Sequence, residues 1–352
     1  MKSSPLTLLA AATTAAAAAP RNVMYFDQWH TATLPPKDVT AGVTHVITAF
    51  APDGTFNWGS SYTPFMSLSD VRALFDQGTK VCMAIGGWGD TTGFGTAAAS
   101  DESRKRYAKN VADALNNLGY DCVDVDWEYP GGNGEDYKTN PNSGKTSEIE
   151  TYPLLLKEIK AVIGDKELSI AVPGKVGDMI AFTADQVPKI AETVDFVNVM
   201  TYDLMNRRDN VTNHHTSVSG SLETVETYLS LVHHRGRATC DQATGCATAV
   251  LEDANGNDTQ KSGAITFEKE NYSGDFLNAM NNGKADTEKG GQWYWDAAKK
   301  VYWTWDTPDF IAKKMTDIVK AKGLGGVMAW SLAQDSHDWS HIKALQSGIK
   351  NL

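Results

Sequence analysis

One ten-residue stretch, residues 121–130, alternates acidic and apolar residues. Asp124, Asp126 and Glu128 are spaced two residues apart. In a β-strand this spacing places the three carboxyl groups on one face, with successive members roughly 6–7 Å apart. Pro130 and the two glycines after it end the strand, so Glu128 is expected at its C-terminal end. The opposite face is expected to carry the apolar residues Val123, Val125 and Trp127.

This grouping of acids has a chemical use. Carboxyl groups held close together cannot all ionise easily, so the pKa of one is raised. An acid that keeps its proton at mild pH can break a glycosidic bond as a general acid. Trp127 and Tyr129 flank Glu128, and sugar rings stack on aromatic faces. A half-solvated strand with its acids facing water is the alternative, but strands between helices are usually buried on both faces. The acids are then expected to point into a barrel or crevice.

Segments with strand and helix patterns alternate along most of the chain, which favours a parallel sheet or barrel. The expected strands cover residues 22–29, 44–50, 80–85, 121–128, 168–172, 194–200 and 325–330. The expected helices cover residues 67–75, 100–118, 146–163, 184–193, 221–233, 307–322 and 338–348. Three of these helices have N-terminal capping signals, namely Ser69, Ser100 and a capping box of Ser147 with Glu150.

The alternation fails after the helix at 221–233. A seventh buried strand should follow, but residues 233–240 are polar and hold no run of four apolar residues. The seventh strand is therefore expected to be missing or reduced. Residues 241–300 are expected to form a small inserted region, with short strands at 249–251 and 263–267. Two aromatic-rich runs, 292–295 and 301–305, are expected either in a core or as an exposed platform for sugars.

Composition and the first residues narrow the class of protein. The 352 residues are 41% hydrophobic and carry a net charge of -11, which argues against a nucleic-acid partner because phosphate binding needs a basic face. Lys2 followed by the apolar, Ala-rich residues 6–19 predicts a signal peptide over residues 1–19. No later run is long and apolar enough to span a bilayer. Residues 20–352 are therefore expected to be a secreted, extracellular and monomeric catalytic domain.

The four cysteines and the histidines suggest no metal site. In a secreted protein, Cys240 and Cys246 are expected to form a local disulfide. Cys82 and Cys122 each lie near the start of a buried strand and are expected to be buried thiols rather than a bridge. Since no Cys or His group has metal-ligand spacing, neither a metal nor another cofactor is expected.

With these motifs the chain resembles the chitinases of glycoside hydrolase family 18, in particular the secreted fungal type. Asp121-x-x-Asp124-x-Asp126-x-Glu128 is similar to the fourth-strand signature of that family. Residues 200–203 resemble the sixth-strand motif of the family, and residues 325–330 resemble its last strand. Gly86-Gly87 resembles the end of its third-strand motif. The resemblance implies an α/β fold, a (β/α)₈ TIM barrel with its site at the C-terminal face. It also implies a small α+β insertion before the last strand, consistent with residues 241–300.

The resemblance also implies a reaction, the retaining hydrolysis of β-1,4 bonds between N-acetylglucosamine units of chitin or chitooligosaccharides with substrate assistance. Glu128 would protonate the leaving oxygen while the 2-acetamido carbonyl of the substrate attacks the anomeric carbon and forms an oxazolinium ion. Asp126 would orient the acetamido group, Asp124 would share a proton with Asp126, and Tyr202 would bind the acetamido oxygen. Glu128 would then activate water. The residues expected to bind the sugar are Trp330, Asp203, Tyr25, Trp88, Tyr129, Met200 and Gly87.

Two departures from the family pattern matter. Ala84 stands where the family usually has serine, which removes one hydrogen-bond partner of the strand-four acids. The other departure is the seventh strand, whose absence would expose the edges of its neighbours. Three alternatives stay open: a chitin-binding lectin, which would be expected to have lost the acid at position 128; an endo-β-N-acetylglucosaminidase acting on N-glycans; and a chain that cannot fold without that strand.

Overall fold

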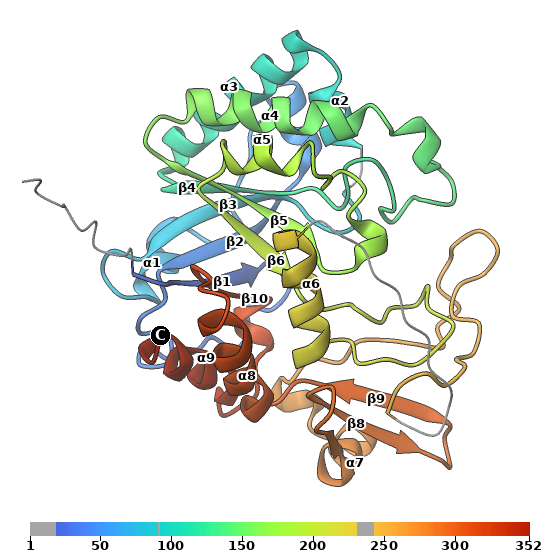
Figure 1. Cartoon of the computed structure of the whole chain (residues 1–352). Coiled ribbons are helices and arrows are strands. Elements are labelled where there is room, and N and C mark those ends of the chain that lie inside the picture. Colours follow the sequence, from blue (N-terminus) through green and yellow to red (C-terminus); the bar gives the residue numbers. More distant parts are fainter. Residues whose placement is uncertain (1–18, 91, 231–242) are drawn as a thin grey trace, which may run out of the picture.

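Seven parallel strands form one sheet that curves into a nearly closed barrel (Figure 1). The computed structural model describes residues 19–90, 92–230 and 243–352. Neighbouring strands follow the order β10-β1-β2-β3-β4-β5-β6. Their bounds are β1 (Arg21–Asp27), β2 (His45–Ala51), β3 (Lys80–Gly86), β4 (Cys122–Asp126), β5 (Glu167–Pro173), β6 (Phe196–Met200) and β10 (Gly326–Ala329). The predicted parallel barrel is confirmed.

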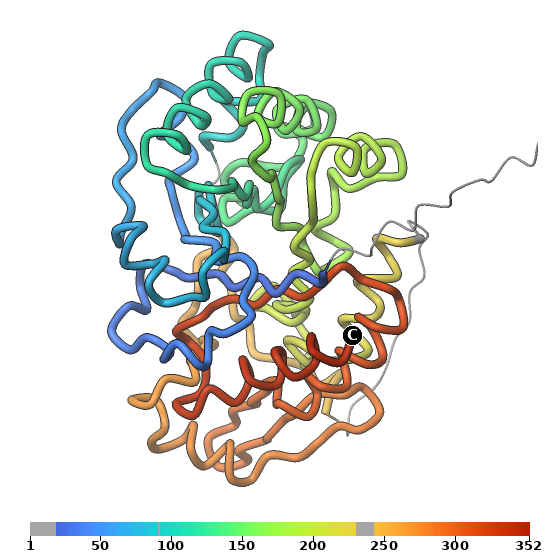
Figure 2. The backbone as a smooth tube through the Cα atoms, turned by 90° about the vertical axis from the view of Figure 1, so that its left-hand side faces the viewer, coloured from blue at the N-terminus to red at the C-terminus, as the bar shows by residue number. Residues whose placement is uncertain are grey.

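Helices cover the outside of this barrel. Helices α2 to α5 lie on one side of the sheet, and α8 and α9 lie on the other (Figure 1). Their bounds are α1 (Leu68–Ala73), α2 (Gly93–Ala98), α3 (Asp101–Leu118), α4 (Glu148–Val162), α5 (Val187–Ala191), α6 (Val218–Ser230), α8 (Pro308–Lys314), which continues as a π-helix over Met315–Lys320, and α9 (Ser340–Lys350). Figure 2 shows α9 beside the segment that follows β1, where Gln346 Nε2 donates a 2.9 Å hydrogen bond to the carbonyl of Ala41.

The helix caps agree with the sequence only in part. Ser100 caps α3 as predicted, in a capping box. Helix α1 is capped by Ser67 rather than by Ser69, because the Ser67 side chain accepts a hydrogen bond from the amide of Asp70. The capping box predicted at Ser147 is wrong. Ser147 already has helical backbone angles, so its side chain makes no capping hydrogen bond.

Strand β4 has the alternation that the sequence predicts. Val123, Val125 and Trp127 belong to the large core between the sheet and the outer helices. Cys122 belongs to a smaller cluster inside the barrel, together with residues of β1, β2 and β3. Asp124 also faces inward, because its carboxylate is hydrogen-bonded to the side chain of Tyr25 in that cluster. The acids therefore line the barrel interior, as expected.

Two inward-facing cysteines correct the sequence interpretation. Cys82 on β3 and Cys122 on β4 are joined by a disulfide, not left as buried thiols. They are direct neighbours in the register of the two strands, with their Cα atoms 4.4 Å apart, which is within the range that a disulfide spans. The bridge predicted between Cys240 and Cys246 involves residue 240, which lies outside the described residues.

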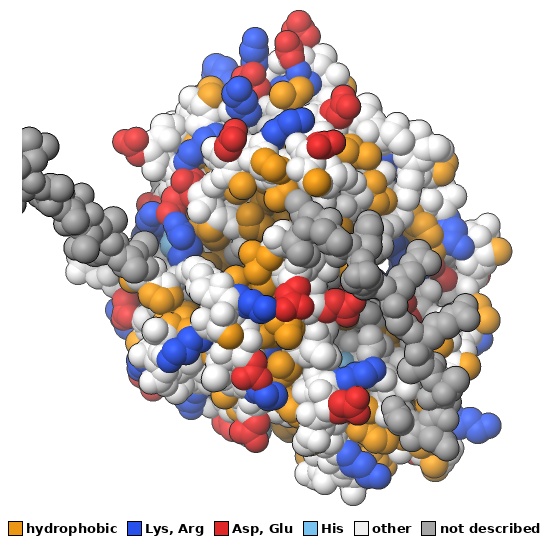
Figure 3. Space-filling view, viewed as in Figure 1, with side chains coloured by type: hydrophobic (Ala, Val, Ile, Leu, Met, Phe, Trp, Pro, Cys, Tyr) orange, Lys and Arg blue, Asp and Glu red, His pale blue; other side chains and the backbone are white. Residues whose placement is uncertain are grey.

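One side of the barrel is open between β6 and β10. Strand β6 pairs with β5, strand β10 pairs with β1, and the described residues hold no strand between these two borders. Every residue of β10 is partly exposed, and Val197 on β6 is 41% exposed. Figure 3 shows hydrophobic side chains at the surface over the region of β5 and β6. The described residues therefore agree with the predicted reduction of strand seven, while residues 233–240, where that strand was expected, lie wholly outside them.

A small antiparallel sheet precedes the last helices. It consists of β7 (Lys284–Asp286), β8 (Gly291–Asp296) and β9 (Val301–Trp305), with α7 (Gly274–Asn282) against it. The strands predicted at 249–251 and 263–267 are wrong, because both segments are irregular. The aromatic runs form the strands instead. His214 holds the sheet to the barrel through Asp286 Oδ2 and Thr304 Oγ1, each 3.1 Å away.

The predicted signal peptide over residues 1–19 falls almost wholly outside the described residues. Among the helices that the structure describes, none has the length and apolar character needed to cross a membrane.

Candidate active site

Two of the three strand-four acids line a cavity of 1690 Å³. Asp124 lies within β4, Asp126 is the last residue of that strand, and Glu128 follows two residues later. Asp126 and Glu128 line the cavity together with Tyr202 and Trp330, which follow β6 and β10. The cavity therefore opens at the carboxyl ends of the strands, and it continues along the open side as far as Arg21 at the start of β1.

Asp124 is the most enclosed of the three acids. It has no exposed surface, and three neutral groups donate to its carboxylate. Tyr25 donates to Oδ2 at 2.6 Å, while Ser169 and Asn198 donate to Oδ1 at 2.6 and 3.2 Å. Burial raises the pKa of Asp124, and these three hydrogen bonds oppose the rise because they stabilise the ionised form.

Asp126 lies between two other acids and has the most strongly raised pKa. Burial is the main cause, and the charges of Glu128 and Asp124 add to it. Its Oδ1 is buried and has no hydrogen-bond partner among the described residues. Such an unpaired acceptor is rare in a native structure and indicates that another group completes it.

Glu128 is partly exposed to the cavity. Burial raises the pKa of its carboxyl group to about 7, and the charge of Asp203 adds to the rise. A hydrogen bond from Tyr129 partly opposes it. Glu128 therefore keeps its proton up to near-neutral pH, which a general acid requires.

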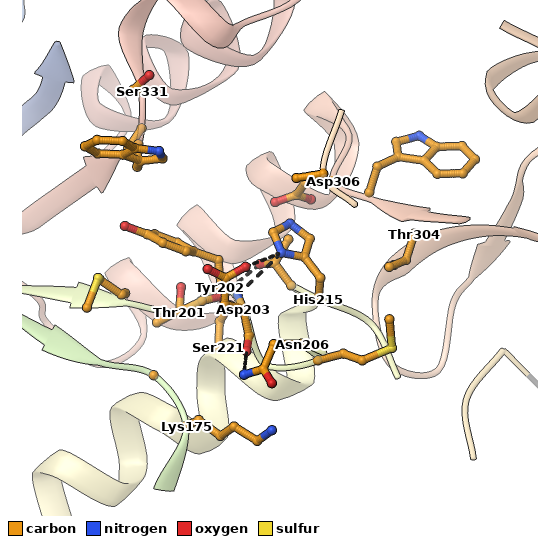
Figure 4. Close-up of a pocket in the computed structure, with 18 of the residues that line it drawn as sticks. Lys175, Thr201, Tyr202, Asp203, Asn206, His215, Ser221, Thr304, Asp306 and Ser331 are labelled. Carbon is orange, nitrogen blue, oxygen red and sulfur yellow. Dashed lines mark hydrogen bonds and ion pairs between the residues drawn. The ribbon is translucent and has the colours of Figure 1, made fainter. Parts of the chain in front are cut away.

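The end of β6 supplies three predicted site residues. Met200 is buried, and Tyr202 and Asp203 follow it at the cavity wall. The hydroxyl of Tyr202 makes a weak contact of 3.9 Å with Met328 Sδ. Asp203 has a left-handed backbone angle of φ 52° and pairs with His215 at 3.4 Å. Figure 4 shows Tyr202 and Asp203 side by side, with the ring of His215 directed toward Asp203.

Aromatic rings form two groups around the cavity. The indole of Trp330 stacks on Phe50, with ring centroids 5.4 Å apart, and lies against Tyr25 at 5.7 Å. At the rim, Trp88 is 46% exposed and lies between Tyr129 and Arg208. The guanidinium of Arg208 is 5.2 Å from the Trp88 ring. Both groups place flat apolar faces beside the acids.

Gly87 is not among the residues that line the cavity. Its amide donates a 2.8 Å hydrogen bond to the carbonyl of Asp126, and a Cβ at this position would lie 2.6 Å from the Phe50 ring. Its backbone also has a positive φ of 91°. The glycine therefore allows the end of β3 to approach both Phe50 and β4 closely.

Several residues around the acids were not singled out from the sequence. Ser169 and Asn198 are polar residues in largely apolar strands, a pattern that could have identified them from the sequence. Phe50 and Arg208 carry no comparable signal, because their contacts depend on how separate loops meet. Among the described residues, no group of three or more His, Cys, Asp or Glu side chains could hold a metal ion.

Comparison with known proteins places this site in a family. The profile of glycosyl hydrolases family 18 matches residues 21–335. The chain belongs to this family. It is therefore a glycoside hydrolase whose strand-four acids occupy the C-terminal face of its barrel, where TIM-barrel enzymes carry their active sites.

Relatives of this family 18 chain occur in several groups of organisms. It is 27% identical over 310 residues to chitinase A1 of Niallia circulans, which covers 77% of this chain but only 42% of that protein. It is 25% identical over 363 residues to endochitinase 1 of Metarhizium anisopliae, covering 89% of this chain and 81% of the relative. Since bacterial, fungal and insect relatives all match, a specifically fungal type is not established.

Solved structures match the fold over nearly the whole chain. A GH18 chitinase from Cycas revoluta, solved in complex with (GlcNAc)3, superposes with a TM-score of 0.71 at 20% identity. The match covers 94% of this chain and 99% of the plant chain. Catalytic domain 2 of the group II chitinase of Ostrinia furnacalis also gives 0.71 at 20% identity. At this identity the likeness shows the fold alone.

Proposed function

We propose that the chain is a secreted chitinase that hydrolyses β-1,4 bonds between N-acetylglucosamine units with retention of configuration. The observation that supports this most directly is Glu128. Its carboxyl group faces the cavity and keeps its proton up to about pH 7. Relatives named chitinases in several organisms support the choice of chitin as the substrate.

In the first step, the proton of Glu128 passes to the glycosidic oxygen as the bond to the anomeric carbon breaks. The acetamido carbonyl of the same sugar attacks that carbon, so that a cyclic oxazolinium ion forms. Glu128, now ionised, takes a proton from water, and this water attacks the anomeric carbon and opens the oxazolinium ring. The sugar keeps its β configuration because the anomeric carbon is inverted twice.

Asp126, Asp124 and Tyr202 prepare the acetamido group. The unpaired Oδ1 of Asp126 is an acceptor for the amide N–H of the substrate. Asp124 shares a proton with Asp126, which agrees with the raised pKa of both groups. Among the described residues, the hydroxyl of Tyr202 has only a weak sulfur contact, so it can donate to the acetamido oxygen.

The aromatic groups hold the sugars on either side of the bond that breaks. Trp330, stacked on Phe50, forms the floor under the sugar that reacts. Trp88 and Tyr129 offer ring faces at the rim. The remaining substrate-contact positions in this proposal are Asp203, Tyr25, Met200 and Gly87, with Gly87 acting through the backbone that it positions.

Export through the signal at residues 1–19, and action outside the cell as a monomer, are part of the same proposal. The Cys82–Cys122 disulfide supports an oxidising compartment, since stable disulfides are rare in the cytosol. The interpretation of residues 20–352 as one catalytic domain is supported by the family match over residues 21–335.

The test compares hydrolysis of a chitin oligosaccharide by the wild type and by Glu128→Gln, with the anomer of the first product read by proton NMR. Release of the β-anomer by the wild type and none by the variant would support the proposal. Equal activity of both would remove Glu128 from the mechanism. A folded wild type that binds the sugar without cleaving it would be a lectin. Cleavage of an N-glycoprotein but not of chitin oligosaccharides would indicate an endo-β-N-acetylglucosaminidase.

A further inference from the structure

Asp124 lies between two direct neighbours in the sheet register, Ala84 on β3 and Ser169 on β5. Registered residues on adjacent parallel strands direct their side chains to the same face. Both neighbours therefore flank the Asp124 carboxylate, one from each side. Ala84 presents a buried methyl group, whereas the Ser169 hydroxyl donates a 2.6 Å hydrogen bond to Oδ1.

A carboxylate with no exposed surface depends on its donors. Without water, its ionised form is stabilised only by the hydrogen bonds that the protein supplies. Tyr25 donates a hydrogen bond to Oδ2, while Ser169 and Asn198 donate to Oδ1. Of the two donors to Oδ1, Ser169 is closer, at 2.6 Å against 3.2 Å for Asn198.

We propose that Ser169 is a positioning residue, which orients Asp124 and favours its ionised form by supplying from β5 the hydroxyl that Ala84 cannot supply from β3. This proposal rests on the proposed function, because it concerns the acids of the same site. Together with Tyr25 and Asn198, Ser169 gives Asp124 three neutral donors among the described residues.

The effect reaches the general acid through Asp126. The charge of Asp124 helps to raise the pKa of Asp126, and a side-chain hydrogen bond with Asp126 in turn lowers the pKa of Glu128. The other titratable groups near Asp124 are Tyr25 from β1 and Tyr202 after β6, which face it, and Tyr152 from α4, which lies behind β4 in the outer core. The pKa of each of these phenols is far above its ordinary value because of burial, so they stay neutral at working pH. Asp126 is therefore the group that titrates together with Asp124.

The direction of the expected pKa change follows from the loss of a hydrogen-bond donor. Loss of the Ser169 hydroxyl removes a hydrogen bond to the ionised form of Asp124, so the pKa of Asp124 rises. The active enzyme needs a negative charge on the Asp124–Asp126 pair. The acidic limb of the pH profile of kcat/KM is therefore expected to move to higher pH in Ser169→Ala, by about one unit for a hydrogen bond to a charged group.

Three variants make the experiment specific. Ser169→Thr keeps the hydroxyl and should leave the acidic limb in place. Ser169→Ala should move the limb upward. Ala84→Ser combined with Ser169→Ala returns a hydroxyl from the opposite strand and should restore the wild-type limb. A role in packing alone does not predict this rescue, because Ala84 and Ser169 lie on different strands.

Two results would overturn the proposal. One is a Ser169→Ala enzyme whose rate is reduced equally at every pH, with the acidic limb unmoved. The other is a shifted limb that the second-site serine does not restore. If Ser169→Ala does not fold, Ala84→Ser in the wild type gives the answer. A fourth donor should move the acidic limb to lower pH, and an unmoved limb contradicts the proposal.

The role of Ser169 can be tested even if the proposed function fails. If the wild type hydrolyses no chitin oligosaccharide, the proposed function fails, but the pKa of Asp124 can still be measured. Carbon-13 NMR of aspartate carboxyl groups, compared between the wild type and Ser169→Ala, reports that pKa without catalysis. An unchanged Asp124 titration would then reject the role of Ser169.

Discussion

The phenol of Tyr25 donates a 2.6 Å hydrogen bond to the buried carboxylate of Asp124, although 99 residues separate them in the chain. Tyr25 lies on β1 and Asp124 on β4, so this bond crosses the interior of the barrel. Both strands belong to the part of the sheet that is continuously paired. The open side between β6 and β10 therefore does not interrupt this support of the acids.

Tyr25→Phe is expected to lower the free energy of unfolding by about 1–3 kcal/mol, because a buried carboxylate loses one donor. Tyr107→Phe is a matched control. The Tyr107 hydroxyl is buried without a hydrogen-bond partner among the described residues, so its removal should cost almost nothing. Urea unfolding of both variants measures the difference. Equal losses in the two variants would show that the Tyr25–Asp124 bond contributes no stability of its own.

The raised pKa of Glu128 gives stability and activity a definite pH dependence. In the folded protein this pKa is about 7, compared with an ordinary value of 4.5, so folding favours the protonated form. The stabilisation is fully present below about pH 4.5 and is lost as the pH rises through about 7. Because Glu128 is partly exposed, the loss is about 1–3 kcal/mol rather than the full value of the shift.

Glu128→Gln removes this titration and serves as the control. The variant should become more stable than the wild type as the pH rises above about 7, when both are unfolded by urea across the pH range. The hydrolysis rate of the wild type should fall over the same interval, since the general acid loses its proton. Parallel stability curves for the two proteins would show that Glu128 titrates normally.

Tyr202→Phe is expected to separate activity from stability. Within the part of the chain that the structure describes, the hydroxyl of Tyr202 has only the weak contact with Met328 Sδ, so the variant should unfold at the same temperature as the wild type. Under the proposed function, kcat should fall by roughly 10²-fold, because a donor to the developing charge is lost. Melting curves and oligosaccharide hydrolysis test the two halves of this prediction. A large drop in melting temperature, or unchanged kcat, would contradict it.

The Cys82–Cys122 disulfide is expected to stabilise the closed part of the barrel. It links positions 40 residues apart, and a loop of this length corresponds to about 2–4 kcal/mol. The double variant Cys82→Ala/Cys122→Ala should lose about that much free energy of unfolding. The two sulfur positions are buried, so a reductant should have little effect on the folded wild type. Mass spectrometry of the unreduced protein checks the bridge itself, and free thiols at both positions would refute it.

The local pattern of β4 was predictable, whereas the partners of its acids were not. Alternation alone places Asp124 and Asp126 opposite Val123 and Val125, since the period of a strand is two residues. The donors to Asp124 come from β1, β5 and β6, and their positions depend on the register of each strand pair. A single sequence contains no direct signal for that register.

The missed disulfide and the ambiguity of the aromatic runs share this cause. Cys82 and Cys122 look like separate core residues until β3 and β4 are aligned, and they then become direct neighbours. The aromatic residues 292–295 and 301–305 were ambiguous because aromatic side chains suit both a core and a strand. In the structure the two runs pair as a hairpin, which aligns Trp293 with Thr304 and Trp295 with Tyr302.

The open side of the barrel affects how the rings of the site are spaced. Tyr202 follows β6 and Trp330 follows β10, and the described residues supply no backbone hydrogen bonds between these two borders. The separation of the two rings therefore depends on side-chain contacts, such as that between Tyr202 and Met328. Under the proposed function, a sugar held by both rings would act as a brace across this side. Amide hydrogen exchange in β6 and β10 should then slow when an oligosaccharide binds, while the disulfide-linked strands change little.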